Sequence, residues 1–122
     1  MASAVEQAVD TYIRIASERD PIVRAKLVEA CWAEDGRLVV HGGRTIAGRA
    51  ALLAMYDRFF ADTSVTGVRV LARDARGTTF RFRYATDLAD GTTLEASDAG
   101  EIDDDGRIRL LIVFNGPELE HT

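Results

Sequence analysis

One aspartate in the sequence lies where the buried face of a strand is expected, and a carboxyl group there could act as an acid or a base. Residues 92–102 alternate between two faces, as in a strand with one face buried. Asp98 shares its face with apolar residues, whereas Glu95 and Glu101 fall on the other face. An unpaired carboxylate is costly among apolar groups, so it must find a partner or take up a proton. The simpler alternative is a structural aspartate bound by backbone amides or an arginine.

Two tyrosines and a histidine are further candidates for proton chemistry. Tyr12 and Tyr56 lie on the apolar faces of expected helices, where a tyrosine either packs in the core or donates a hydrogen bond from its hydroxyl. His41 carries a side chain that titrates near neutral pH and ends an expected strand. Alternation places His41 opposite Leu38 and Val40, which indicates an outward or rim position. A surface histidine beside a turn is the simpler interpretation.

Other residues are candidates for the wall of a substrate pocket, and they are equally suited to an ordinary core. The set comprises Trp32, Val40, Phe60, Phe82, Tyr84, Ile112 and Phe114, with Asn115 as a polar residue at the end of the last strand. Asn115 could bind a ligand, or it could stabilise a turn at the strand end, where asparagine is common.

Three helices followed by strands must position these residues. Ser3 and Glu6 form a capping box before the first helix, and Asp20-Pro21 predicts the start of a second that ends near Trp32. A third helix should start near residue 48. Strands are expected at residues 36–41, 44–47, 65–74, 78–88, 92–102 and 107–115, with turns at 42–43, 76–77, 90–91 and 104–106.

Consecutive strands with short turns predict an antiparallel meander. We therefore expect an α+β fold, in which three N-terminal helices pack on a curved antiparallel sheet, as one domain over residues 1–122. A cleft between helices and sheet is a usual place for a small-molecule site. Residues 118–122 should be a frayed tail after Gly116-Pro117 closes the last strand.

The amino-acid composition limits the kinds of binding partner that we expect for the protein. The net charge is −5 and the basic residues are scattered, which argues against a nucleic-acid or membrane partner. With Cys31 as the only cysteine and only two histidines, we expect no disulfide within the chain, no metal site and no cofactor. The first residues show no signal peptide, and no apolar run reaches membrane-spanning length, so we expect a cytoplasmic protein.

Five short motifs, spread over almost the whole chain, resemble the NTF2-like superfamily in their order and spacing. They are residues 31–37 (CWAEDGR), 47–49 (AGR), 97–101 (SDAGE), 105–109 (DGRIR) and 114–117 (FNGP). This superfamily contains ketosteroid isomerase, scytalone dehydratase and the SnoaL-type polyketide cyclases. The resemblance implies a cone-shaped fold that encloses a pocket, and it is strongest to the SnoaL-like group of bacterial proteins.

The resemblance to ketosteroid isomerase also implies roles for individual residues. Tyr12 matches the oxyanion-hole tyrosine, Tyr56 a supporting tyrosine of the same network, and Asp98 an aspartate that donates a hydrogen bond while protonated. The proton-shuttling aspartate is matched by Val40, which cannot move a proton, so steroid isomerisation by the familiar mechanism is improbable. In SnoaL-type cyclases a pocket aspartate is itself the acid–base group, a role that Asp98 would fill alone. A rim histidine, His41, could supply the missing base.

These observations lead to an expected function with two alternatives. The first is cofactor-independent proton transfer, by isomerisation, cyclisation or dehydration, on an apolar carbonyl substrate in the pocket. The second is non-catalytic binding of an apolar metabolite, and the third is an association module with a vestigial pocket. Arg81 and Arg83 alternate with aromatic residues and fall on the opposite face, which is either solvated or the interface of a homodimer.

Overall fold

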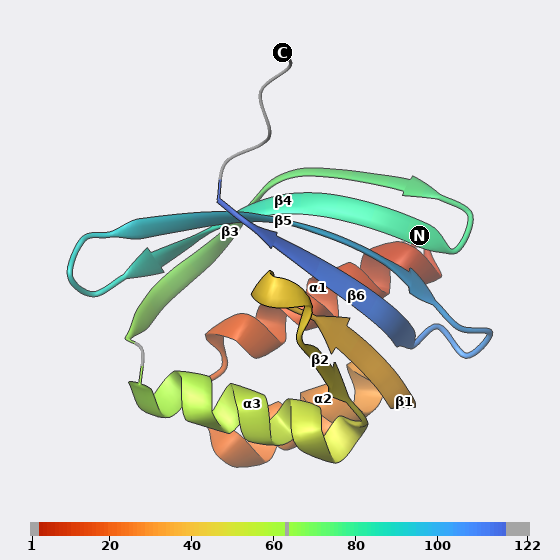
Figure 1. Cartoon of the computed structure of the whole chain (residues 1–122), viewed down its shortest axis with the longest axis horizontal. Coiled ribbons are helices and arrows are strands. Elements are labelled where there is room, and N and C mark those ends of the chain that lie inside the picture. The colour runs from red at the N-terminus through yellow and green to blue at the C-terminus, as the bar shows by residue number, and fades with distance from the viewer. Residues whose placement is uncertain (1–2, 63, 117–122) are drawn as a thin grey trace.

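Three helices cover one face of a curved six-stranded sheet (Figure 1). The computed structural model describes residues 3–62 and 64–116. Its elements are α1 (Ala4–Ser17), α2 (Pro21–Cys31), β1 (Trp32–Val39), η1 (His41–Gly43), β2 (Thr45–Ala47), α3 (Arg49–Asp62), β3 (Val65–Arg76), β4 (Thr79–Leu88), β5 (Thr93–Ile102) and β6 (Ile108–Asn115). The expected α+β fold of three helices on a curved sheet is confirmed. Pro117 and the expected tail at 118–122 lie outside the described residues.

The sheet is mixed rather than wholly antiparallel. Strands β3 to β6 form the expected antiparallel meander. However, β1 pairs with β6 in parallel, with Leu38 beside Leu111, and the sheet order is β2-β1-β6-β5-β4-β3. This pairing joins distant parts of the chain, so no turn sequence between the two strands predicts it. Strand β1 also begins at Trp32 rather than at residue 36, because the chain passes from α2 directly into the strand.

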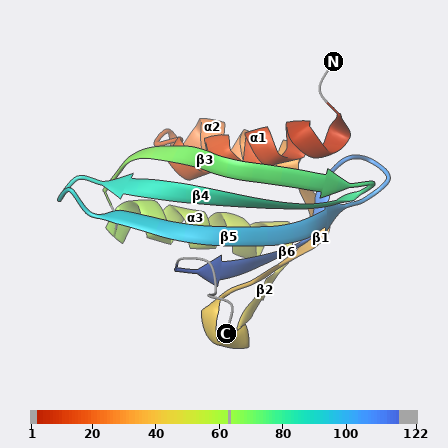
Figure 2. The same ribbon diagram turned by 90° about the horizontal axis from the view of Figure 1, so that it is seen from above.

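Alternation along the strands separates an inner sheet face, toward the helices, from an outer face. Residues 80, 82, 96 and 98 point inward and are buried, and the core continues into the helices through Ile15 and Leu52, which are fully buried. Seen from above, β3 to β6 lie in front of the helices (Figure 2). Among the described residues, the helices therefore cover only the inner face. None of these helices is long and apolar enough to span a membrane.

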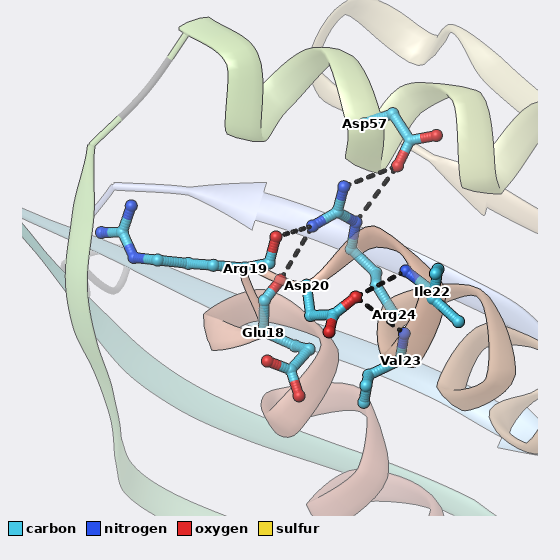
Figure 3. Close-up of polar contacts among 7 residues, drawn as sticks. All are labelled: Glu18, Arg19, Asp20, Ile22, Val23, Arg24 and Asp57. Carbon is cyan, nitrogen blue, oxygen red and sulfur yellow. Dashed lines mark hydrogen bonds and ion pairs between the residues drawn. The ribbon is translucent and has the colours of Figure 1, made fainter.

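Capping side chains fix where the first two helices start, as the sequence predicts. The Ser3 hydroxyl accepts a hydrogen bond from the amide of Glu6 at 3.1 Å. The Asp20 carboxylate accepts from the amide of Ile22 at 2.9 Å, in front of a proline at the first helical position (Figure 3). These caps fix the starts of both helices. Helix α1 carries Tyr12, and α2 leads directly into β1.

A buried arginine joins the α1–α2 loop to α3. Arg24 in α2 is 4% exposed and donates to the carboxylate of Asp57 at 2.7 Å and to the backbone carbonyl of Glu18 at 2.9 Å, with a longer bond of 3.4 Å to Arg19 (Figure 3). Its guanidinium also lies 4.6 Å from the ring centre of Phe60. A buried charge is stable only when it is paired and hydrogen-bonded, so Arg24 holds these segments in one arrangement.

Candidate functional site

Asp98 lies at the centre of the inner sheet face. It pairs with Phe82 on β4 and with Val113 on β6, and its side chain faces the helices. Asp98 is 1% exposed, and neither of its carboxyl oxygens makes a hydrogen bond of normal geometry within the described chain. The sequence pattern correctly placed Asp98 on the buried face. The alternative of an aspartate bound by backbone amides or by an arginine is not what the described residues form.

Two tyrosine hydroxyls approach the Asp98 carboxyl from different elements. Tyr12 reaches it from α1, and Tyr84 reaches it from β4, two residues beyond Phe82 on the same face. Burial raises the pKa of Asp98 to about 7, and the two hydroxyls act in the opposite direction by stabilising the carboxylate. Desolvation therefore outweighs hydrogen bonding. A carboxyl with this pKa is present both protonated and ionised at neutral pH.

The tyrosines themselves stay protonated at any physiological pH. Burial and the nearby Asp98 charge raise the pKa of Tyr12 and of Tyr84 well above the ordinary value. Both hydroxyls can therefore donate hydrogen bonds to Asp98 or to a ligand oxygen. Because a protonated Asp98 can also donate, the cluster presents up to three donors in an apolar environment, where such donors stabilise a developing negative charge most strongly.

Tyr56 belongs to a neighbouring part of the core. Its hydroxyl lies against the indole of Trp32, and burial raises the pKa of Tyr56 above its ordinary value. The Tyr56 hydroxyl and Trp32 Nε1 are both buried without a hydrogen bond of normal geometry among the described residues. Tyr56 interacts with Asp98 and Tyr12 only through charge, which raises the pKa values of the tyrosines. The supporting role that the resemblance implies for Tyr56 is therefore indirect in this arrangement.

Four aromatic rings pack against one another on the face of the sheet that carries Asp98. The ring centres of Tyr12 and Phe82 are 5.7 Å apart, those of Phe82 and Tyr84 are 5.5 Å apart, and those of Tyr12 and Trp32 are 6.3 Å apart. Gly36 permits this packing, because a Cβ atom there would lie only 2.8 Å from the Trp32 ring. Of the expected wall residues, Phe82 lies opposite Asp98 and Tyr84 acts on its carboxyl, whereas Trp32 packs against Tyr12.

Other expected pocket residues are spread over the molecule. Val40 is half-buried against the core, and since Val39 pairs with Ile112, Val40 follows beside Val113. With strands about 4.8 Å apart, Val40 is two strands, or about 10 Å, from Asp98. Phe60 lies instead against Arg24.

The register places two expected wall residues on the wrong side of the sheet for a pocket at Asp98. Ile112 pairs with Ala99 and Phe114 with Ser97, so both lie on the outer face, and Phe114 is 58% exposed. The reason is the strict alternation of β6, in which Val113 faces inward. Asn115 does lie on the inner face, opposite Ala96, but it is exposed at the strand end.

His41 stands apart from the cluster. It lies in η1, exposed, just after β1, and it is not among the groups that shift the pKa of Asp98. The outward orientation that alternation indicated agrees with this position. Its role as a base therefore stays a prediction without support from a contact to Asp98.

The best-formed hollows of the described chain lie away from Asp98. Five of them are not lined by Asp98, Tyr12 or Tyr56. One of these, about 560 Å³, opens around Arg81 and Arg83 on the outer face. Near Asp98, the side chains of Tyr84 and Val113 are only half-buried, whereas Asp98 itself is 1% exposed. Among the described residues, no group of three or more metal-ligating side chains occurs.

Comparison with known proteins gives structural neighbours but no sequence relatives. No family model and no curated protein matches the sequence. A protein of Agrobacterium tumefaciens, proposed to be an isomerase of the SnoaL-like family, is similar over 95% of this chain and all of its own, with a TM-score of 0.80 and 23% identity. A Sinorhizobium meliloti protein proposed to be a polyketide cyclase matches 92% of this chain and 99% of its own, with a TM-score of 0.71 and 18% identity.

A third neighbour has a ligand in its structure. It is a protein of Catenulispora acidiphila with a ketosteroid isomerase-like fold, solved with trimethylamine, and it covers 88% of this chain and 84% of its own, with a TM-score of 0.71 and 16% identity. At these identities the comparisons describe the fold. The expected resemblance in fold to the NTF2-like superfamily, and to SnoaL-like proteins within it, is confirmed.

Proposed function

Because the chain has the NTF2-like cone fold of SnoaL-like and ketosteroid isomerase-like proteins, we propose that it catalyses cofactor-independent proton transfer on an apolar carbonyl compound. One observation carries the proposal. Asp98 is 1% exposed, its pKa is raised to about 7, and two tyrosine hydroxyls approach it. A carboxyl with a pKa near the working pH is suited to take up and release protons, and such groups concentrate in active sites.

The proposed reaction needs only the groups of the cluster. Ionised Asp98 takes a proton from the carbon next to the substrate carbonyl, and the electron pair of that C–H bond moves onto the carbonyl oxygen. The hydroxyl of Tyr12 donates to this oxygen as its charge develops. When the substrate has a C=C bond between its β and γ carbons, Asp98 then delivers a proton to the γ carbon while the carbonyl re-forms, which isomerises the substrate and leaves Asp98 ionised for the next turnover.

Val40 favours a second candidate, the binding of an apolar metabolite without turnover. The family position of the proton-shuttling aspartate carries a valine here, and Val40 is about 10 Å from Asp98 across β6. The exposed Phe114 on the outer sheet face favours, in turn, an association module with a vestigial pocket.

Deuterium exchange separates these candidates without knowledge of the product. Enones, polyketide-like ketones and steroids are first screened by thermal shift, because a compound that binds only the folded state raises its stability. Binders are then incubated with the protein in D₂O, and exchange of the hydrogens next to the carbonyl is followed by proton NMR. Exchange that is lost in Asp98→Asn supports catalysis. Binding without exchange supports a metabolite-binding protein. If no compound binds, association is the better supported of the three functions.

We also propose a homodimer through the outer sheet face. Phe114 is 58% exposed there, beside half-buried Ile112 and the ion pair between Arg83 and Glu95 at 3.2 Å. An apolar centre with charged groups around it is typical of an interface. Sedimentation at micromolar concentration is expected to give a dimer that Phe114→Asp converts to a monomer. Ile22→Asp, which changes an apolar residue 70% exposed on α2, should leave it intact. A monomeric wild type would contradict the proposal.

A further inference from the structure

We propose that Tyr84 is a positioning residue of this site, whose hydroxyl binds and orients the Asp98 carboxyl. Neither the family resemblance nor the sequence pattern gives Tyr84 more than a place in the wall. The inference concerns the chemistry of the proposed acid–base group and rests on the proposed function only for its effect on turnover.

The register of β4 and β5 brings the two side chains together. Phe82 is directly opposite Asp98, and Tyr84 is opposite Ala96, so Tyr84 and Asp98 are diagonal neighbours on the inner face. Diagonal neighbours in an antiparallel sheet are about 7–8 Å apart, which the long side chain of a tyrosine can span. The Phe82 ring packs against the Tyr84 ring with their centres 5.5 Å apart, and this contact fixes the direction of the hydroxyl.

Burial distinguishes Tyr84 from the other tyrosine at the carboxyl. Tyr12 is 7% exposed and lies beneath the sheet, whereas Tyr84 is half-buried against the edge of the core. Of the two tyrosines at the carboxyl, Tyr84 is therefore the more exposed to solvent. A hydroxyl that binds the carboxyl at this point holds one of its oxygens and leaves the other toward Tyr12 and the ligand.

The other groups around Asp98 do not replace this hydroxyl. Tyr12 acts on Asp98 from α1. Tyr56 on α3 and Cys31 at the end of α2 have pKa values raised by burial, and neither shifts the pKa of Asp98. Val113 on β6 brings no polar side chain. Among the described residues, Tyr12 and Tyr84 are the side chains whose hydroxyls lower the pKa of Asp98.

Tyr84→Phe tests the proposal, with Tyr56→Phe as its matched control. Each variant removes one tyrosine hydroxyl, but of these two only the Tyr84 hydroxyl is among the groups that lower the pKa of Asp98. A carbon-detected NMR titration of Asp98 is expected to show its pKa raised by about half a unit to one unit in Tyr84→Phe, which is the size of one ordinary hydrogen bond. Tyr56→Phe should leave it unchanged.

The outcomes separate this proposal from the proposed function. An Asp98 pKa that is unchanged in Tyr84→Phe, or raised equally in Tyr56→Phe, overturns the role of Tyr84 whether or not the protein is an enzyme. A raised pKa in a protein that exchanges no carbonyl hydrogens supports Tyr84 and rejects catalysis. If exchange occurs, its pH profile should move upward with the Asp98 pKa. Tyr84→Met, which keeps apolar volume, gives the same test should Tyr84→Phe disturb the fold.

Discussion

Replacing Asp98 with asparagine is expected to abolish carbonyl hydrogen exchange while leaving the protein as stable as the wild type, or more stable, at neutral pH. Asparagine keeps the shape of the side chain but cannot take up a proton, so the loss should be at least a hundred-fold, the lower end for a general acid–base group. The gain in stability arises because the wild type buries a carboxyl whose ionised form is disfavoured.

The pH dependence of this effect has a definite sign. The pKa of Asp98 is about 7 in the folded protein, against an ordinary value of 3.8. Between these values the unfolded chain has already lost the proton that the folded protein keeps, so stability falls as pH rises from about 4 to about 7. The cost is absent below this window and reaches roughly 4 kcal/mol above it. Asp98→Asn removes the cost, so its stability relative to the wild type should rise across the same window.

Urea unfolding of both proteins at several pH values between 4 and 8 measures this difference. Asp104→Asn is the control, because Asp104 is exposed and the same chemical change there should leave the pH dependence of the wild type intact. An Asp98→Asn variant that is less stable by a constant amount at every pH would instead identify an aspartate held ionised by hydrogen bonds.

The sequence predicted the fold well because its signals are local. Caps at Ser3 and Asp20 mark the helix starts, and each chain-neighbouring strand pair has a turn between its members. The parallel pairing of β1 with β6 lacks such a signal. The buried position of Arg24 was also missed, since apolar spacing alone favours Val23 and Leu27 as the inward residues of α2.

The site was only partly predictable, and the β4–β5 hairpin shows why. A two-residue turn at Asp90-Gly91 would pair Asp98 with Arg83. The charged side chain of Arg83 would then lie on the same sheet face as Asp98. The face patterns require instead that Asp98 pair with Phe82, as the structure has it. With that register, Tyr84 could have been placed beside Asp98 from the sequence. The approach of Tyr12 could not, because it depends on how α1 packs across the sheet.

Replacing Arg24 with alanine is expected to cause the largest loss of stability of any single change discussed here. The substitution leaves the carbonyls of Glu18 and Arg19 without their donor, removes the contact with Phe60 and leaves a cavity at a residue that is 4% exposed. Hydrogen bonds from a charged donor contribute about 1.5–3 kcal/mol each. Because Asp57 is half exposed and can be solvated, we expect a total loss of roughly 3 kcal/mol rather than the upper limit for a buried ion pair.

Two further variants identify where this loss comes from. Asp57→Asn removes only the half-exposed partner and should cost less than about 1 kcal/mol, whereas Arg69→Ala, which breaks the exposed pair with Asp87, should leave the stability almost unchanged. Urea unfolding of all three variants at pH 7 and one salt concentration gives the comparison. If Arg24→Ala matched Arg69→Ala, the α1–α2 loop and α3 would be held together by their apolar contacts, and Arg24 would be dispensable to the fold that positions Asp98.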